Sequence, residues 1–340
     1  MHIGILTFYF ADNYGAVLQC YALQKYIQSK GHDVYVIPYK PFKMIPMKAR
    51  VRSFFFHNVQ EKKFINFRER YLNIKKLKKY DLVIVGSDQV WNPDIIFCDK
   101  HWINPKCEYD EIIAYAVSFG KSFFSLKDKK FFLNNRKNLE RYKKIGVREK
   151  EGMDLLKEFE INSEVVCDPT LLLLDNVIAY DEIAKFSEYD IGFEYVLVYA
   201  LEKSEELNRI ITKIKNSSDI IIIAIHPMNV NYCNVDQFIY DAGPSEFLDL
   251  IKNANMVITN SFHGLVFSLI YHKKVISITS EKLGTRQKQL YEWKGQDIRR
   301  IGKNSVEISA DVELNHVRNM VLKSETYIMK NVMCGQLSEE

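Results

Sequence analysis

The chain has 340 residues, of which 47% are hydrophobic and 26% are charged, and its formal net charge is +4. This composition is typical of a soluble globular protein with about two domains, and it excludes an intrinsically disordered chain. The sequence starts without a basic leader and apolar core, and it holds no run of about 18 uncharged apolar residues, so we expect a cytoplasmic protein.

Strand-like and helix-like segments alternate in the first half of the sequence. An apolar strand at 3–8 precedes helical spacing at 15–30, which stops at Gly31, and a strand at 34–37 completes a βαβ unit. The remaining elements expected in this half are helices at 128–143 and 149–159 and strands at 81–86, 112–117, 144–147 and 164–167.

A second alternating series begins near residue 195. Its expected elements are strands at 195–200, 220–224, 256–259 and 275–278, and helices at 203–215, 244–254, 285–295 and 313–330, with one more that begins near His263. The two series predict an α/β protein with two Rossmann-like domains that face each other across a ligand-binding cleft. We expect an N-terminal domain at 1–180, a C-terminal domain at 190–312, and a final segment at 313–340 with the option of crossing back to the first domain.

The most informative motif is Asn-Ser-Phe-His-Gly at residues 260–264, between an apolar strand and an apolar helix. His263 is thereby placed where a strand ends and a helix begins, which is where open α/β sheets bind ligands. Backbone N–H groups in a first helical turn favour an anion, and an imidazole beside them can donate a hydrogen bond or pass a proton. An acidic small molecule is therefore predicted; the alternative is a histidine ring satisfied by a nearby carbonyl.

The turn after the first strand lacks the G-x-G-x-x-G spacing of a dinucleotide site, which argues against a nicotinamide cofactor. Asp12 or Asn13 either caps the next helix or binds a substrate, and the role of Gln19 is open in the same way. The six cysteines form no C-x-x-C pair, so reduced thiols are expected, and neither a metal nor another cofactor is implied.

Several later turns that follow strands also carry polar or charged side chains. Segment 114–120 ends in a small, glycine-closed turn that contains Ser118 and suits either close approach to a ligand or an ordinary strand exit. Segment 86–93 is more typical of a binding loop than of a simple turn, because it holds Ser87, Asp88, Gln89, Trp91 and Asn92.

Two more charged residues follow predicted strands. Arg148 could bind a carboxylate or phosphate through its forked guanidinium, or could pair at the surface with Glu149 or Glu151. Asp168 precedes a proline, which keeps it out of helical geometry, so it either forms a turn or faces the cleft.

These motifs, in this order, resemble those of the polysaccharide pyruvyltransferase family. The resemblance covers roughly residues 3 to 295, and seven motifs in register make a strong signal although each is weak alone. The matching segments are 13–19, 86–92, 115–120, 147–149, 168–171, 261–264 and 285–286.

The resemblance implies a fold similar to that of GT-B glycosyltransferases, and transfer of pyruvate from phosphoenolpyruvate onto two sugar hydroxyls as a cyclic ketal. The acceptor would be a sugar of a surface polysaccharide or its lipid-linked precursor. Many family members carry an arginine two positions before the motif histidine, whereas this sequence has Ser261.

In such an enzyme we expect His263 to act as acid/base or to contact phosphate, Arg148 and Arg286 to clamp the anion, and Asp88 to bind an acceptor hydroxyl or to orient a base. Replacing His263 or Arg148 by alanine should abolish turnover with little loss of stability. The further residues expected to bind substrate are Asn13, Gln19, Ser87, Gln89, Trp91, Ser118, Asp168, Ser261 and Gly264.

Two other functions fit the same architecture. One is a GT-B glycosyltransferase that uses a nucleotide sugar, and the other is a non-catalytic sugar-binding relative, which the departure at Ser261 keeps open. Phosphate release from phosphoenolpyruvate in the presence of a sugar acceptor would separate the pyruvyltransferase from both.

A basic segment at 43–79 holds twelve Lys or Arg residues against two acids, with Phe54, Phe55 and Phe56 in its middle. It suits either an anionic membrane surface, where lipid-linked acceptors reside, or a solvated helix with its phenylalanines in the core. Nucleic acid is not expected, because the net charge is small and no reader motif is present.

Overall fold

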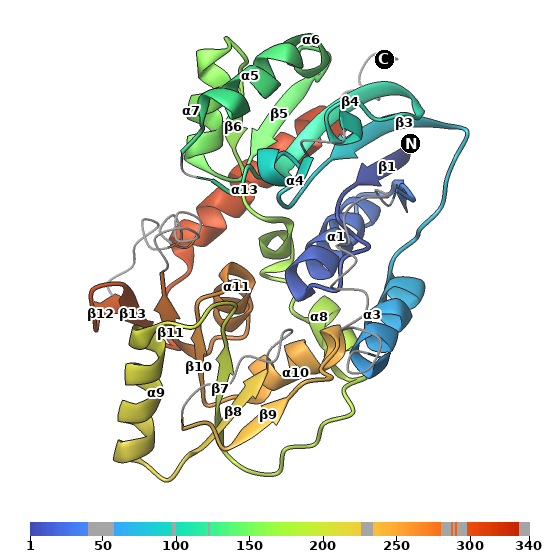
Figure 1. Ribbon diagram of the computed structural model, residues 1–340. Helices are drawn as coiled ribbons and strands as arrows, with labels where there is room; N and C mark the ends of the chain where they lie inside the picture. The colour runs from blue at the N-terminus through green and yellow to red at the C-terminus, as the bar shows by residue number, and fades with distance from the viewer. Residues whose placement is uncertain are drawn as a thin grey trace. The chain divides into compact units, whose positions relative to one another are not determined.

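The structure is a computed structural model that describes residues 1–39, 58–96, 100–121, 123–225, 234–279, 287, 290 and 298–332. It is a mixed α/β protein with two largely parallel sheets, as predicted, in two compact units (Figure 1). Unit 1 takes its described residues from 1–52, 68–173 and 318–340, and unit 2 takes them from 53–67 and 174–317.

Unit 1 is built on a six-stranded parallel sheet in the order β2-β1-β3-β4-β5-β6. Its central strands are buried almost throughout, which explains why they are continuous apolar runs in the sequence. The strands are β1 (His2–Leu6), β2 (Asp33–Val36), β3 (Lys79–Val85), β4 (Glu108–Val117), β5 (Lys144–Val147) and β6 (Glu164–Val165).

The helices of unit 1 follow the predicted alternation with one correction. The helix expected at 128–143 is two helices, because Asn135 leaves helical geometry and its side-chain amide donates to the Phe131 carbonyl oxygen over 2.9 Å. The helices are α1 (Tyr14–Gln28), α4 (Pro93–Ile96), α5 (Leu126–Asn134), α6 (Arg136–Leu139) and α7 (Lys150–Glu158), with 3-10 turns η1 (Lys100–Trp102) and η2 (Pro169–Leu173).

Unit 2 has a seven-stranded sheet in the order β12-β13-β11-β10-β7-β8-β9. Five strands are parallel: β7 (Tyr195–Tyr199), β8 (Ile221–Ile225), β9 (Gln237–Ile239), β10 (Met256–Thr259) and β11 (Lys274–Ile278). The sequence did not predict β9 or the antiparallel pair β12 (Ile298–Arg300) and β13 (Ser305–Ile308). The helices are α8 (Ile178–Ala184), α9 (Glu205–Ser217), α10 (Pro244–Asn253) and α11 (Phe262–Ile270), while the helix expected at 285–295 lies outside the described residues.

Helix α3 (Asn58–Tyr71) has its first ten residues in unit 2. Lys63 forms ion pairs of 2.9 Å with Glu188 and with the buried Glu246, and Gln60 donates to the Ala242 carbonyl oxygen. Burial would lower the pKa of Lys63, but its bonds to these two carboxylates raise it, so this lysine is a half-buried structural cation. The Phe54–Phe56 cluster of the basic segment lies outside the described residues.

Helix α13 (Asn315–Val332) contributes its residues from 318 onward to unit 1. Tyr327 donates its hydroxyl to the Ala114 carbonyl oxygen of β4 over 2.7 Å, and Ser324 Oγ accepts the Cys167 amide over 2.8 Å. These bonds fix the last helix against the sheet built from the start of the chain. No helix among the described residues has the length and apolar character needed to cross a bilayer.

Candidate functional site

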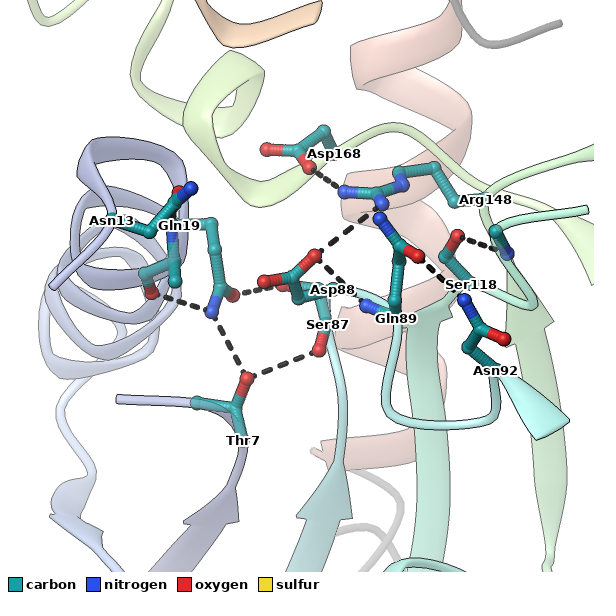
Figure 2. Close-up of polar contacts among 12 residues, drawn as sticks. Thr7, Asn13, Gln19, Ser87, Asp88, Gln89, Asn92, Ser118, Arg148 and Asp168 are labelled. Carbon is teal, nitrogen blue, oxygen red and sulfur yellow. Dashed lines mark hydrogen bonds and ion pairs between the residues drawn. The ribbon is translucent and has the colours of Figure 1, made fainter. Parts of the chain in front are cut away.

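The turns at the carboxyl ends of neighbouring strands gather polar side chains in unit 1 (Figure 2). Strands β1, β3, β4 and β5 are adjacent and parallel, so their carboxyl ends share one edge of the sheet. We call the polar group at this edge the strand-end cluster. It comprises Thr7, Gln19, Ser87, Asp88, Gln89, Asn92, Ser118, Arg148, Glu149 and Asp168.

One side of the cluster joins α1 to the loop after β3. Gln19 Nε2 donates to Thr7 Oγ1 over 2.9 Å, Thr7 Oγ1 donates to the Ser87 carbonyl oxygen, and Ser87 Oγ donates to Gln19 Oε1 (Figure 2). All three side chains are fully buried. Because protein groups occupy their polar atoms, we infer that Gln19 and Ser87 hold the loop in place.

The loop after β3 reaches the next strand through its backbone. Ser118 donates its N–H to the Asp88 carbonyl oxygen over 2.8 Å, and Gly86 adopts φ +111°, where a Cβ would overlap the Tyr115 carbonyl oxygen. Trp91 lies wholly in the core, with its indole N–H donated to the Trp102 carbonyl oxygen. Its buried ring therefore anchors the loop to the core of unit 1.

Three members of the strand-end cluster were not among the predicted site residues, namely Thr7, Asn92 and Glu149. Ser118 Oγ accepts the Gly120 N–H over 3.1 Å and donates to Glu149 Oε1, while Asn92 Nδ2 donates to Gln89 Oε1 over 2.7 Å. Glu149 was considered only as a surface partner of Arg148, yet it is buried. Its place directly after Arg148, at the carboxyl end of a buried strand, was the available signal.

Arg148 is the centre of the cluster and is almost wholly buried. Its Nη1 donates to Asp168 Oδ2 over 2.7 Å, and its Nη2 lies 3.7 Å from Asp88 Oδ1 (Figure 2). Its Nε lies 3.6 Å from Glu149 Oε1. Burial would lower the pKa of the guanidinium, but the charges of Glu149, Asp168 and Asp88 raise it above its ordinary value. One permanent cation thus faces three carboxylates.

Asp168 forms a turn, which was one of its two predicted interpretations, and it also pairs with Arg148. Its Oδ1 accepts the Thr170 N–H over 3.0 Å and the Thr170 hydroxyl over 2.7 Å, while Oδ2 bonds Arg148. The carboxylate is fully buried, so we infer that it orients the guanidinium.

A second set of candidates lies in unit 2, at the carboxyl end of β10. Ser261 caps α11 by accepting the Gly264 N–H, and His263 stands in the first helical turn with 8% of its surface exposed. A Cβ at Gly264 would lie 2.9 Å from the Tyr199 ring and closer still to the Thr259 side chain. The helix therefore packs tightly on β7 and β10, which fixes the backbone that carries His263.

The remaining candidates have separate positions. Asn13 caps α1 by accepting the Ala16 N–H over 3.1 Å, as one of its two interpretations predicted, and Asp12 pairs with Arg68 over 2.8 Å. Arg286 lies outside the described residues. Within the described part of the chain, no three His, Cys, Asp or Glu residues are grouped so as to hold a metal ion.

Comparison with solved structures finds distant likenesses over nearly the whole chain. The UDP-GlcNAc 2-epimerase of Methanocaldococcus jannaschii is 14% identical, with 96% of this chain and 92% of that one covered and a TM-score of 0.49. A putative UDP-N-acetylglucosamine 2-epimerase from Listeria monocytogenes is 10% identical, with coverages of 97% and 88% and a TM-score of 0.49. An E. coli heptosyltransferase is 12% identical, with coverages of 97% and 100% and a TM-score of 0.41.

No curated protein is similar to the chain at a significant level. The model of one protein family, described as polysaccharide pyruvyl transferase, matches residues 13–282. That span includes every member of the strand-end cluster except Thr7, together with Ser261, His263 and Gly264. Because the match extends over more than half of the sequence, the chain belongs to the polysaccharide pyruvyl transferase family.

Proposed function

We propose that the protein transfers pyruvate from phosphoenolpyruvate to two hydroxyls of a sugar as a cyclic ketal, in the biosynthesis of a surface polysaccharide. The observation that carries the proposal is that the family match includes the strand-end cluster, apart from Thr7, and the first turn of α11. A sugar or a lipid-linked oligosaccharide would be the acceptor.

The reaction requires an acid that protonates the methylene carbon of the donor and a base that takes the protons of the sugar hydroxyls. Protonation of the methylene carbon creates an oxocarbenium-like centre, and a sugar hydroxyl adds to it with loss of its proton. Phosphate then leaves, and the second hydroxyl closes the ring while its proton is taken up by the departing phosphate or a base. We assign the acid role to His263. We assign binding of an acceptor hydroxyl to Asp88, whose carboxylate lies 3.7 Å from Arg148.

The donor carries a phosphate and a carboxylate, so it needs positive charge around it. Arg148 supplies a guanidinium that Asp168 holds in a fixed orientation. Because three carboxylates surround this single cation, the cluster is negative overall and would repel an anion on its own. We therefore propose that donor binding requires further positive charge, for which Arg286 and His263 are the candidates.

The test is phosphate release from phosphoenolpyruvate by the purified full chain, with and without a galactoside or mannoside acceptor. We expect release that depends on the acceptor, together with a product whose mass has increased by one carboxyethylidene bridge. His263→Ala should lower kcat by at least about 100-fold, since general acid–base catalysis contributes that much. The matched control is His316→Ala, because His316 is exposed on α13 and should not affect turnover.

Two results would contradict the proposal. One is the absence of phosphate release with every acceptor when the protein binds nucleoside diphosphates in a thermal-shift screen, which would favour a nucleotide-sugar glycosyltransferase. The other is equal loss of activity in His263→Ala and His316→Ala, which would remove His263 from the chemistry.

A further inference from the structure

Helix α5 and the residues before it expose an unusual number of large apolar side chains. Phe123 is 79% exposed, Leu126 88% and Leu133 54%, all within eleven residues. The core contacts of this segment are made by other residues, since Phe124, Phe131 and Phe132 are buried and the Phe124 and Phe132 rings pack on Phe119. The exposed side chains are therefore not needed for the packing of unit 1.

The same segment is basic. Lys127 and Lys130 are exposed on α5, and Lys137 is exposed on α6. The one acid between residues 123 and 137, Asp128, is buried and pairs with Lys121 over 3.1 Å. The neighbouring Glu140, Glu158 and Glu160 pair with Arg136 or Lys129, and Lys130 and Lys137 stay exposed at the surface.

Helical geometry brings the two kinds of side chain together. Leu126, Lys130 and Leu133 stand at positions i, i+4 and i+7 of α5, which is one face of a helix. We call this face, together with Phe123, Lys127 and Lys137, the α5 face. Elsewhere among the described residues, exposed Ile178 and Leu322 lack such clustering and need no partner.

We propose that the α5 face docks on an anionic lipid bilayer. Apolar side chains that enter the boundary between headgroups and acyl chains, beside lysines that attract anionic lipids, are the features of an interfacial helix. The surface follows the strand-end cluster closely in sequence, because Ser118 of the cluster is five residues before Phe123. A bilayer held there would bring a lipid-linked sugar to the same edge of the sheet.

This assignment differs from the basic segment at 43–79 that the sequence favoured for a membrane. In the described part of that segment, Lys63 and Arg68 are neutralised by Glu246 and Asp12. Exposed Lys75, Lys76 and Lys78 have no exposed aliphatic or aromatic side chain among them, since Leu77 is half-buried. A bilayer contact through the α5 face therefore predicts that the lysines of this face contribute to vesicle binding and that Lys75, Lys76 and Lys78 do not.

The experiment is co-sedimentation of the full chain with vesicles of phosphatidylcholine containing one quarter phosphatidylserine, and with pure phosphatidylcholine. We expect binding to the anionic vesicles that falls steeply at high salt. Phe123→Ser with Leu126→Ser should lower the partition coefficient by more than about tenfold. Each of Lys127→Gln, Lys130→Gln and Lys137→Gln should lower it about fivefold.

Matched controls make the outcome decisive. Ile178→Ser with Leu322→Ser removes two other exposed apolar side chains, which are 70% and 58% exposed, and the triple change of Lys75, Lys76 and Lys78 to Gln removes three lysines from the earlier candidate segment. Both should bind vesicles as the unmodified protein does. The proposal is overturned if no vesicle binds, if neutral vesicles bind equally well, if the triple-lysine control loses binding, or if sedimentation velocity shows a dimer that the Phe123/Leu126 variant abolishes.

Discussion

Arg148 carries a permanent charge in a site that is almost closed to solvent, and this makes it important for stability as well as for chemistry. Removing it would take the 2.7 Å ion pair from the buried Asp168 carboxylate and would take a cation from beside Glu149 and Asp88. Breaking a buried ion pair costs about 3–5 kcal/mol. The expectation of unchanged stability for Arg148→Ala, drawn from the sequence, is therefore revised.

We predict that Arg148→Ala lowers the free energy of unfolding by about that amount, as measured by urea denaturation. Arg148→Lys keeps the charge but loses the fork, so it should be less damaging. In a double-mutant cycle with Asp168→Asn, the two changes should be strongly coupled, because they remove the same 2.7 Å bond. Additive effects of the two substitutions would show that this ion pair is not what stabilises the turn.

Gly264 is a second residue that shapes the site, because its lack of a side chain allows close packing beside His263. Its position against Tyr199 and Thr259 has no room for a methyl group. Gly264→Ala should therefore shift the start of α11, cost about 1–3 kcal/mol through overpacking, and lower turnover through displacement of His263. Stability would be followed by thermal denaturation and activity by phosphate release.

Gly192 supplies the control for this substitution. A Cβ at Gly192 meets no atom within 4 Å, so Gly192→Ala should change neither stability nor activity appreciably. If both alanine variants behaved like the unmodified protein, the close approach at Gly264 would not be what positions His263.

At this scale the sequence could locate the turns but not the direction of each side chain. Polar residues that follow buried strands are easy to recognise, and Asp88, Ser118 and Arg148 were found in this way. Whether a polar group faces a ligand or another protein group depends on tertiary contacts between distant segments. Gln19 and Ser87, which are 68 residues apart in sequence and bonded to each other, show why periodicity could not reveal their role.

Helix α5 begins with a capping box that makes its stability depend on pH. Ser125 Oγ accepts the Asp128 N–H, and the Asp128 carboxylate accepts the Ser125 N–H over 3.0 Å and a bond from Lys121. Burial would raise the pKa of Asp128, but these bonds outweigh it and hold the pKa below its ordinary value. The carboxylate therefore stabilises the folded state above an unfolded pKa of about 3.9, and this contribution is lost as the pH falls through the folded value.

We predict that Asp128→Asn weakens the protein by about 1 kcal/mol at pH 7, as is usual for a lost cap, and flattens the decline of stability below pH 4. Urea denaturation between pH 3 and pH 7 would measure both effects. Asp94→Asn is the matched control, because Asp94 also pairs with Lys121 over 2.9 Å but is exposed. An unchanged acid profile in Asp128→Asn would assign the acid sensitivity to other carboxylates.

Elements that form buried parallel strands were predicted within a few residues, because nothing but continuous apolar sequence suits that environment. The elements that were missed lack such a signal. Strand β12 reads Ile-Arg-Arg with two exposed residues at the edge of the sheet. Helix α3 buries only a narrow stripe, Gln60, Phe64 and Phe67, within a highly charged sequence, and Lys63 pairs with acids that are 125 and 183 residues away in sequence.

The whole molecule is not a simple succession of two domains, because unit 1 draws on both ends of the chain. Helix α13 buries four apolar side chains there, namely Val321, Tyr327, Ile328 and Val332. Each such side chain contributes about 1.5–3 kcal/mol, so their sum approaches the about 5–15 kcal/mol by which a whole domain is stable. The last helix is therefore a part of the first unit's core.

We predict that a chain ending at Val317 loses the folded state of unit 1, which circular dichroism and limited proteolysis would detect as disordered, protease-sensitive segments within residues 1–173. Tyr327→Phe is the informative comparison, since it removes only the hydroxyl bond to the Ala114 carbonyl and should cost about 1 kcal/mol while the fold survives. If the shortened chain kept the melting temperature of the full protein, α13 would not contribute to the stability of unit 1 or of the strand-end cluster. Because β4 and β5 carry Ser118 and Arg148 at their carboxyl ends, loss of the helix behind them should abolish activity together with stability.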